Sequence, residues 1–250
     1  MTARVLAIGG SDPSGGAGIQ ADLKTFHQFG VYGEAVITLI TVQNSMRVSR
    51  VEVLEPRLIA EQIAAVVEDI PPAAAKTGAL GSAEALRVVA RAAEAFRCPL
   101  VVDPVLASKH GAALGGLGWE ELLPRAALVT PNLPESEALT GTGDPRRAAC
   151  RLRDMGAGAV LIKGGHREGD ATDLLLDSEG WLEFPAPRIA TRHTHGTGCT
   201  YSAAITAGLA TGLPLRKAVA RAKRFIHQAI ATNPGLGRGC GPVNHHAEVT

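Results

Sequence analysis

The chain has 250 residues, of which 46% are apolar, 20% are charged and 4% are aromatic, and its formal net charge is +1. This charge balance gives no basic surface for nucleic acid, and the few aromatic residues offer little stacking area for single-stranded nucleic acid. The sequence also contains no run of about 18 apolar residues, the length needed to span a bilayer. We therefore expect a protein that binds a small neutral or anionic ligand and has no nucleic-acid or membrane partner.

Short apolar runs alternate with stretches of helical period from the N-terminus onward. The expected strands are Val5–Ile8, Ala35–Thr41, Leu100–Asp103, Ala127–Thr130 and Ala159–Lys163. Ile19, Leu23 and Phe26 recur at the spacing of a helix with one buried face, and apolar residues repeat in the same way from Leu58 to Ile70. This alternation predicts an α/β fold, with helices on both faces of a mostly parallel central sheet and ligands at the carboxyl ends of its strands.

The C-terminal part of the chain adds a hairpin and two helices. The hairpin is expected over Ala171–Phe184, at one edge of the sheet, and the helices over roughly Cys199–Thr211 and Leu215–Ala231. Because no low-complexity linker or internal repeat interrupts the chain, residues 1–250 are expected to form a single domain. We expect His245 and His246 to lie in a solvated tail.

Cysteine spacing and the N-terminus both bear on the compartment. Cys98, Cys150, Cys199 and Cys240 have no CxxC spacing, which argues against a zinc site and against a disulfide framework. We expect all of them except Cys199 to be structural or surface residues. The first residues lack the apolar stretch of a signal peptide and lead directly into a predicted strand. A cytoplasmic protein is expected.

A glycine-rich loop, Gly9–Gly18, joins the first predicted strand to the first helix and lets the backbone approach a ligand closely. Gly16-x-Gly18-x-x-Ala21 formally fits a dinucleotide fingerprint, but the second strand ends in Gln43-Asn44 where an NAD site needs Asp or Glu. No Gly-Lys pair occurs, so a Walker A loop is excluded and any ATP site must be of another type. A plain turn that needs glycine remains the alternative.

A second candidate anion site is His195-Gly196-Thr197-Gly198-Cys199-Thr200, at the start of a helix. Consecutive backbone N–H groups and the helix dipole there favour a phosphate. The same dipole is expected to lower the pKa of the Cys199 thiol, which could then accept a proton. Two alternatives stay open: Cys199 as a small buried residue, or as a covalent nucleophile with His195 as its base, although no Asn or Asp in the motif would orient His195.

Four polar residues lie at or just after the ends of predicted strands and suit a nucleotide with magnesium. Asn132 and Glu135 lie three residues apart at a helix start, where their oxygens suit Mg²⁺ or, alternatively, form a capping box. Asp103 could orient metal or phosphate, or serve as a turn residue before Pro104. Lys163 could reach a phosphate, or be a solvated strand end.

Two more residues could contact an organic substrate. The carboxamide of Gln43 offers donors and an acceptor that complement the edge of an aminopyrimidine, unless neighbouring backbone groups satisfy it. Asp22, near the start of the first helix, could face the ligand or simply favour the helix dipole.

Taken together, these residues resemble the hydroxymethylpyrimidine and phosphomethylpyrimidine kinase family of the ribokinase-like superfamily. The matching segments are Gly10–Lys24, Gly30–Asn44, Thr130–Glu135, Thr194–Thr200 and Gly241–His245. The resemblance implies a three-layer ribokinase-like fold, ATP and Mg²⁺ as cofactors, and a homodimer. It also implies two phosphorylations in thiamine biosynthesis, which convert 4-amino-5-hydroxymethyl-2-methylpyrimidine to its monophosphate and then to the diphosphate.

The resemblance also implies a role for each matching position. Gly196, Thr197, Gly198 and Cys199 would hold the transferred phosphoryl group, with Cys199 as the base. The expected pyrimidine-binding residues are Asp12, Ala17, Asp22, Gln43, Ala79 and Val105. The expected nucleotide-binding residues are Asn132, Lys163 and Asp103, and the expected metal ligands are Glu135 and Asp103.

Two positions depart from the family pattern. Ala79 stands where relatives commonly have methionine, and His110 replaces a usual serine. The smaller Ala79 could admit a larger ring, so a pyridoxal or pyridoxine kinase is the first alternative. A non-catalytic pyrimidine-binding protein is the second, although Asn132, Glu135 and Cys199 speak against it.

Overall fold

The frame of the molecule is a nine-stranded, mostly parallel sheet. The computed structural model describes residues 2–106, 111, 114, 118–166 and 169–250. The strands are β1 (Arg4–Ser11), β2 (Tyr32–Gln43), β3 (Val48–Val53), β4 (Ala74–Thr77), β5 (Leu100–Val102), β6 (Leu128–Val129), β7 (Val160–Ile162), β8 (Asp173–Asp177) and β9 (Gly180–Phe184). They lie in the order β3-β2-β1-β4-β5-β6-β7-β8-β9. The strands from β2 across to β7 are parallel, and β3, β8 and β9 join antiparallel.

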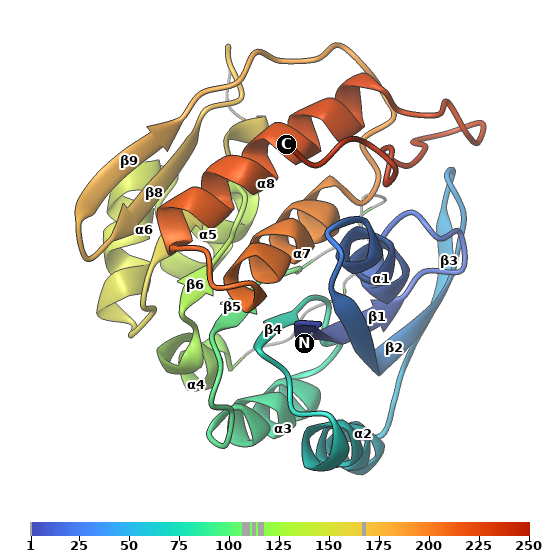
Figure 1. Ribbon diagram of the computed structural model, residues 1–250, viewed down its shortest axis with the longest axis vertical. Coiled ribbons are helices and arrows are strands. Elements are labelled where there is room, and N and C mark those ends of the chain that lie inside the picture. The colour runs from blue at the N-terminus through green and yellow to red at the C-terminus, as the bar shows by residue number, and fades with distance from the viewer. Residues whose placement is uncertain (1, 107–110, 112–113, 115–117, 167–168) are drawn as a thin grey trace.

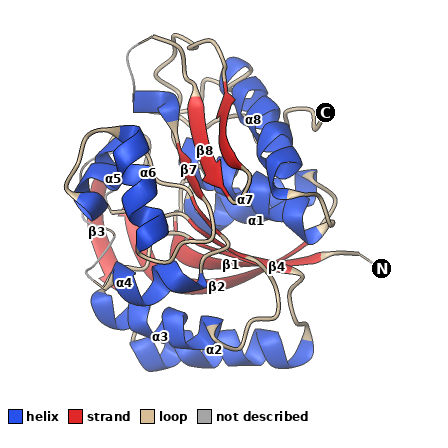
Figure 2. Cartoon of the chain, turned by 90° about the vertical axis from the view of Figure 1, so that its left-hand side faces the viewer, coloured by secondary structure: helices blue, strands red, loops and turns tan. Residues whose placement is uncertain are grey.

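Helices cover both faces of this sheet (Figures 1 and 2). One layer contains α1 (Gly18–Gln28), α7 (Thr197–Ala210) and α8 (Leu215–Ala231). The other contains α2 (Pro56–Asp69), α3 (Ala83–Ala93), α4 (Trp119–Leu122), α5 (Leu133–Thr140) and α6 (Pro145–Asp154). Two short 3₁₀ turns, Leu123–Arg125 and Gly164–His166, complete the described elements. The predicted three-layer α/β architecture is confirmed.

The central strands β1, β5, β6 and β7 are almost continuously apolar because they are buried on two sides. In β1, Leu6 and Ile8 pack with α2 and α3, whereas Val5 and Ala7 pack with α1 and α7. Residues on a strand point alternately to opposite faces, so a strand between two helical layers needs an apolar residue at every position. This explains the continuous runs from which the strands were predicted.

The sheet extends beyond the predicted strands. The hairpin β8–β9 confirms the edge hairpin, but the other edge is also an antiparallel pair, β2–β3, which was not predicted. Its outer strand alternates apolar with charged residues, and β4 is built largely of alanine, which carries no strand preference. The predicted strands ending at Asp103 and Lys163 stop one residue earlier, at Val102 and Ile162.

The C-terminal segment is not the solvated tail that was expected. His245 is buried, and its Nε2 lies 3.1 Å from Thr200 Oγ1 of α7, whereas His246 is exposed. Burial lowers the pKa of His245 to about 4. The segment therefore packs against α7 instead of trailing into water. No helix in the described parts of the chain is long and apolar enough to cross a membrane.

Candidate active site

A pocket of about 680 Å³ lies where the parallel strands end, next to the N-terminus of α7. Its walls come from segments that follow β1, β4, β5, β6 and β7, as expected for an α/β sheet. All the residues predicted from the sequence for the site line this pocket: Asp12, Ala17, Asp22, Gln43, Ala79, Asp103, Val105, Asn132, Glu135, Lys163, Gly196, Thr197, Gly198 and Cys199. His110 lies outside the described residues.

Asp12 organises the glycine-rich loop. Its carboxylate accepts hydrogen bonds from the backbone N–H groups of Ser14 at 2.8 Å and Ala17 at 2.9 Å, and it lies 2.7 Å from His195 Nε2. Burial acts to raise the pKa of Asp12, but hydrogen bonds from His195, Ser14 and Gln43 lower it to about 2. The loop is thus tied by an ionised carboxylate to the segment before α7.

This contact corrects one point of the sequence analysis. His195 does have an orienting carboxylate, but Asp12 supplies it from the opposite end of the chain. The pairing could not be found within the motif, because 183 positions separate the two residues.

The start of α7 forms the predicted anion site. Its N-cap, Gly196, has φ of 78°, and a Cβ at this position would collide with the carbonyl oxygen of Gly16. Only glycine therefore fits where the two loops meet. The Thr197 N–H donates to the carbonyl oxygen of Thr194 at 3.3 Å. No side chain of the described residues caps this terminus, so the N–H groups of Gly198 and Cys199 are the ones left for a ligand.

Cys199 lies in the pocket, but the expected low thiol pKa is wrong. Burial raises the pKa of Cys199 to about 12; Lys76 acts to lower it, and the carboxylates of Asp22 and Asp103 raise it further. Desolvation by burial is the largest cause of this shift, so the thiol pKa is raised where the motif had suggested that it would be lowered. The raised thiol pKa and the contact of His195 with Asp12 both speak against the thiol-hydrolase interpretation.

Lys163 and Asp103 form a buried ion pair. Lys163 Nζ lies 2.7 Å from Asp103 Oδ1, and the lysine side chain is only 13% exposed. Asp103 also accepts a hydrogen bond from Thr130 Oγ1 at 3.1 Å. The alternatives of a solvated strand end for Lys163 and a simple turn residue for Asp103 are therefore wrong.

Asn132 and Glu135 form the capping box of α5. Asn132 Oδ1 accepts from the Glu135 N–H at 2.8 Å, and the Asn132 N–H donates to Glu135 Oε2 at 2.7 Å. The alternative left open for this pair is thus confirmed as a structural role. Both residues nevertheless line the pocket, so the cap also fixes their position beside a ligand.

The charges around Glu135 suit a divalent cation that arrives with phosphates. Burial raises the pKa of Glu135 to about 7, Lys163 lowers it, and Asp103 raises it. Lys163 is 3.9 Å from Glu135, so one ammonium group faces two carboxylates. No three His, Cys, Asp or Glu side chains of the described residues form a metal cluster. Mg²⁺ often uses one or two carboxylates together with substrate phosphates, and these residues fit that pattern.

Lys76, at the carboxyl end of β4, has no predicted role but lines the pocket floor. It is fully buried, and its Nζ lies 2.7 Å from Asp22 Oδ1. This ion pair also corrects the alternative that Asp22 only favours the helix dipole. The signal in the sequence was a lysine closing an apolar run, as at Lys163, but the run is an alanine tract that does not predict a strand.

The remaining wall is apolar and carries Gln43 at its end. Leu39, Ala79 and Val105 line it, and Ala79 is held by a hydrogen bond of 2.6 Å from Thr38 Oγ1 to its carbonyl oxygen. Gln43 is half-buried, and its carboxamide donates to the Asp12 carboxylate, whereas no backbone group of the described residues bonds to it. An apolar wall with one carboxamide suits a heteroaromatic ring.

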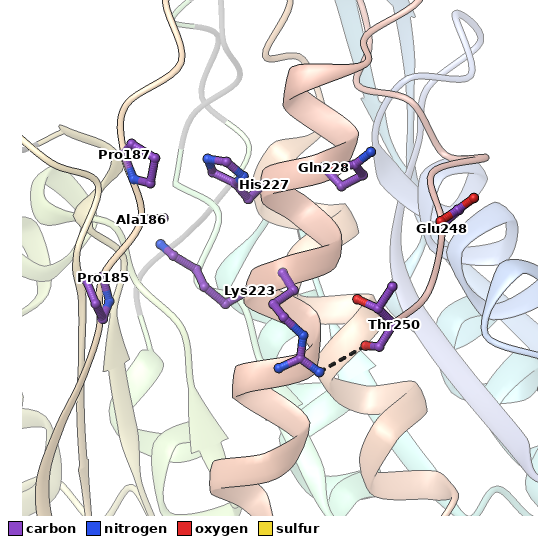
Figure 3. Close-up of a pocket in the computed structure, with 9 residues that line it drawn as sticks. Pro185, Ala186, Pro187, Lys223, His227, Gln228, Glu248 and Thr250 are labelled. Atoms are coloured by element: carbon purple, nitrogen blue, oxygen red, sulfur yellow. Dashed lines mark hydrogen bonds between the residues drawn. The ribbon is translucent and has the colours of Figure 1, made fainter.

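A second hollow, of about 410 Å³, lies beside α8 (Figure 3). Lys223 reaches across it toward Pro185 and Ala186, but its ammonium already bonds to Asp173 at 2.7 Å. Arg224 donates to the carbonyl oxygen of Thr250 at 3.0 Å. Both cations are thus engaged by protein oxygens, and Lys223 also lines the main pocket.

The chain is similar to curated proteins over nearly its full length. A family model described as phosphomethylpyrimidine kinase matches residues 12–244. The hydroxymethylpyrimidine/phosphomethylpyrimidine kinase of Rhizobium meliloti is 47% identical over 259 residues, which cover 98% of this chain and 97% of that protein. The thiamine biosynthesis bifunctional protein of Geobacter sulfurreducens is 49% identical and matches 96% of this chain, but the chain spans only 52% of that protein's length.

Solved structures with the same fold fall into two activity groups. The pyridoxal kinase of Staphylococcus aureus, in complex with AMP-PCP and pyridoxal, has a TM-score of 0.90 at 35% identity, covering 99% of this chain and 94% of that one. The phosphomethylpyrimidine kinase of Clostridium difficile has a TM-score of 0.79 at 41% identity, covering 92% and 100%. These neighbours confirm the ribokinase-like fold.

Proposed function

Because the chain belongs to the hydroxymethylpyrimidine/phosphomethylpyrimidine kinase family, we propose that it uses ATP to phosphorylate 4-amino-5-hydroxymethyl-2-methylpyrimidine twice in thiamine biosynthesis. The first transfer makes the monophosphate and the second makes the diphosphate. One observation carries the proposal: three features line the same pocket. They are an apolar wall that ends in the Gln43 carboxamide, the N-terminus of α7, which no side chain of the described residues caps, and the ion pair of Lys163 with Asp103.

The pyrimidine ring would lie against this apolar wall. Leu39, Ala79 and Val105 form the wall, and the Gln43 carboxamide would bond to the ring nitrogen and amino group. Asp12 fixes the loop that carries Ala17, which closes the pocket on the side of α1. This orientation directs the hydroxymethyl group toward the start of α7.

ATP would occupy the other half of the pocket. Lys163 and Asn132 would contact its phosphates, and the apolar residues Ile226 and Ile230 of α8 would border its base. Glu135 and Asp103 would hold Mg²⁺, which, when bound with ATP, neutralises negative charge on the phosphates. Nucleotides bind relatives of this fold, since the pyridoxal kinase of Staphylococcus aureus has been solved with AMP-PCP.

The N-terminus of α7 would hold the transferred phosphoryl group. Gly196, Thr197, Gly198 and Cys199 would direct backbone N–H groups at the oxygens on which negative charge collects, and the helix dipole adds to this attraction. In a loose phosphoryl transfer most of the rate comes from alignment and charge stabilisation. The close approach of Gly196 to Gly16 fixes both loops in the position that such alignment requires.

We further propose that residues 1–250 act as one domain, as a homodimer in the cytoplasm. One sheet runs from β3 to β9, and α7 and α8 pack back onto it, which favours a single folding unit. The exposed apolar side chains of Ile40, Val42 and Met46 on or beside β2 favour burial against a second copy. Four unpaired cysteines suit a reducing compartment.

The test is to incubate the protein with Mg–ATP and, in parallel, the pyrimidine alcohol, its monophosphate and pyridoxal, and to follow the products by phosphorus NMR. Monophosphate and then diphosphate from the pyrimidine is the expected result. Phosphorylation of pyridoxal alone would instead identify a pyridoxal kinase, the second candidate function. Two observations favour that candidate: the TM-score of 0.90 to a pyridoxal kinase, and the small side chain of Ala79 in the pocket. Binding of the pyrimidine without turnover would identify a non-catalytic binding protein.

A further inference from the structure

We infer that Ser45, in the turn between β2 and β3, is a positioning residue for the pyrimidine. Residues 236–243, which we call the C-terminal strap, hold Ser45 and thereby keep the nearby Gln43 at a fixed place relative to the start of α7. The inference rests on the proposed contact of Gln43 with the pyrimidine ring. It gives a role in substrate binding to a glycine-rich segment that the proposed phosphoryl transfer does not use.

Gln43 lies on a part of β2 that runs beyond the pairing of this strand with β1. That pairing ends at Ile40, opposite Ser11, and one side-chain bond follows it, from Thr41 Oγ1 to the Ser11 carbonyl oxygen at 2.9 Å. Among the described strands only β3 accompanies β2 as far as Gln43, and their register shifts between Val42 and Gln43. Two strands alone have little stability. The place of Gln43 in the pocket therefore depends on what holds the end of this hairpin.

The C-terminal strap holds the hairpin end through two hydrogen bonds to Ser45. The Cys240 N–H donates to the Ser45 carbonyl oxygen at 2.8 Å, and the Gly239 N–H donates to Ser45 Oγ at 3.2 Å. Ser45 is half-buried, whereas its neighbours Asn44 and Met46 are exposed. In Figure 1 the dark red segment after α8 reaches this end of β2 and β3. Ser45 is thus the residue by which the turn is attached.

Two glycines of the strap lie too close to Ser45 to be replaced without a shift. A Cβ on Gly239 would collide with the Ser45 carbonyl oxygen, and a Cβ on Gly237 would lie 2.5 Å from Ser45 Oγ and 2.7 Å from its Cβ. Gly235, just before the strap, also has a positive φ, of 67°, but a Cβ there would meet no atom of the described residues within 4 Å. Close packing on Ser45 is therefore specific to the strap.

The other end of the strap is fixed to the segment before α7. The Gly241 carbonyl oxygen accepts a hydrogen bond of 2.9 Å from the His195 N–H, and the Val243 N–H donates to the His195 carbonyl oxygen at 3.3 Å. His195 immediately precedes Gly196, the N-cap of the helix that would hold the transferred phosphoryl group. One segment therefore links the place of Gln43 to the anion site.

The turn is also held by its own hydrogen bonds, so a displaced strap should shift the turn without unfolding it. Asn44 Oδ1 accepts from the N–H groups of Met46 at 2.9 Å and Arg47 at 3.1 Å. A shift would carry Gln43 away from the ring, and a displacement of well under 1 Å is enough to weaken a hydrogen bond to a ligand. Binding of the pyrimidine should therefore depend on Ser45.

Binding of ATP should not depend on Ser45. Lys163 and Asn132, which would contact the phosphates, follow β7 and β6, and β1, β4 and β5 lie between these strands and β2. Ile226 and Ile230, which would border the base, belong to α8. A selective effect on one of the two substrates therefore separates positioning of Gln43 from a general loss of structure.

The experiment compares Gly237→Ala with its matched control Gly235→Ala in the full chain. Both variants place alanine at a positive φ, so both are strained, but only the first meets Ser45. Gly237→Ala should raise the KM for the pyrimidine alcohol and for its monophosphate about tenfold, with the KM for ATP within about twofold of the parent. Calorimetry without ATP should show the same tenfold rise in Kd for the alcohol. Gly235→Ala should leave all of these values within about twofold.

A double-mutant cycle tests whether the effect acts through Ser45. Ser45→Gly removes the side chain that a Cβ at position 237 would meet, and with it the bond to the Gly239 N–H, so this variant alone should raise the pyrimidine KM roughly threefold. In this background Gly237→Ala should change the pyrimidine KM less than about twofold, because the obstacle is gone.

Three outcomes would overturn the inference: equal effects of Gly237→Ala and Gly235→Ala, a tenfold effect of Gly237→Ala that persists in Ser45→Gly, or an equal rise in KM for the pyrimidine and for ATP. The last is what a purely structural role of the strap predicts. A parent protein that neither binds nor phosphorylates the pyrimidine would instead refute the proposed function.

Discussion

The state of the Cys199 thiol is the clearest prediction at the scale of single residues. Its pKa is raised to about 12 by burial, so at pH 8 only about one thiol in ten thousand is ionised. Cys150 is exposed and is the internal reference. Iodoacetamide at pH 8, followed by peptide mass spectrometry, should label Cys150 at least about tenfold faster than Cys199. In urea the two rates should converge; equal rates in the folded protein would contradict the raised pKa of Cys199.

The residue types at the site were readable from the sequence, but their partners were not. The sequence placed Asp103 and Lys163 at strand ends, yet nothing in it indicated that they pair with each other. Lys76 was missed because it closes a run of alanines. The lowered thiol pKa was wrong because a helix dipole is a local feature that a motif reveals, whereas desolvation depends on the layers that close over the residue.

Helix α5 allows capping and ligand binding to be separated. Asn132→Ala removes the side-chain oxygen that accepts the Glu135 N–H, so it should lower the free energy of unfolding by about 1 kcal/mol. Asn132→Ser keeps a capping oxygen and should cost only a fraction of that. If Asn132 also contacts ATP, both variants should raise KM for ATP several-fold. Urea unfolding and steady-state kinetics test this, and an unchanged KM in Asn132→Ser would mean that Asn132 is only a cap.

Strand β2 carries a buried glutamate that makes stability depend on pH. Neither carboxylate oxygen of Glu34 has a hydrogen-bond partner among the described residues, and burial raises its pKa to about 7, with Arg4 acting to lower it. The folded state therefore favours the protonated form, and the stability that protonation provides is lost as pH rises from about 4.5 through 7.

Glu34→Gln should remove this dependence. Relative to the parent protein, the variant should gain up to about 3 kcal/mol of unfolding free energy between pH 4.5 and pH 7 and gain nothing further above that. Urea unfolding at several pH values measures the difference. Glu52→Gln on the neighbouring strand, where the side chain is 59% exposed, is the matched control and should show no such trend. A constant difference at all pH values would contradict the assigned pKa.

Strands were predictable where burial on both faces of the sheet produces a continuous apolar run, as in β1 and β7. The same rule fails for β3, whose residues alternate because one side of the pair faces water, and for β4, whose alanines fit helix and strand alike. Glu34 also shows the limit of this approach. The predicted strand began at Ala35, whereas β2 begins at Tyr32 and therefore includes Glu34 among its buried positions.

At the scale of the whole molecule, the site is held together by contacts between distant parts of the chain. Asp22 with Lys76, Asp103 with Lys163, and Asp12 with His195 are separated by 54, 60 and 183 positions. The first pair joins α1 to β4, the second joins the segments after β5 and β7, and the third joins the loops before α1 and α7. The α/β pattern predicts that these ends meet at one edge, and this is why every predicted site residue lies in one pocket, but the pairing itself depends on strand order.

The edge of the sheet at β3 provides the last prediction, which concerns assembly. Ile40 and Val42 of β2 are 46% and 54% exposed and lie on the same face, opposite Glu52 and Arg50 of β3. Exposed apolar side chains beside the edge strand of a sheet are unfavourable in water. A two-fold symmetric contact between two copies would bury these side chains in both of them. Light scattering after gel filtration should therefore give the mass of two chains.

Val42→Lys should convert the dimer to a monomer, because two ammonium groups would be brought together at the symmetric contact and desolvated. Tyr32→Lys is the matched control: Tyr32 is 55% exposed on the same strand but stands at its other end. It should remain dimeric at the same protein concentration. If both variants dissociate, the contact is not confined to this face. If neither does, or if the parent protein is already a monomer, the exposed strip at β2 and β3 is not the surface that pairs two copies.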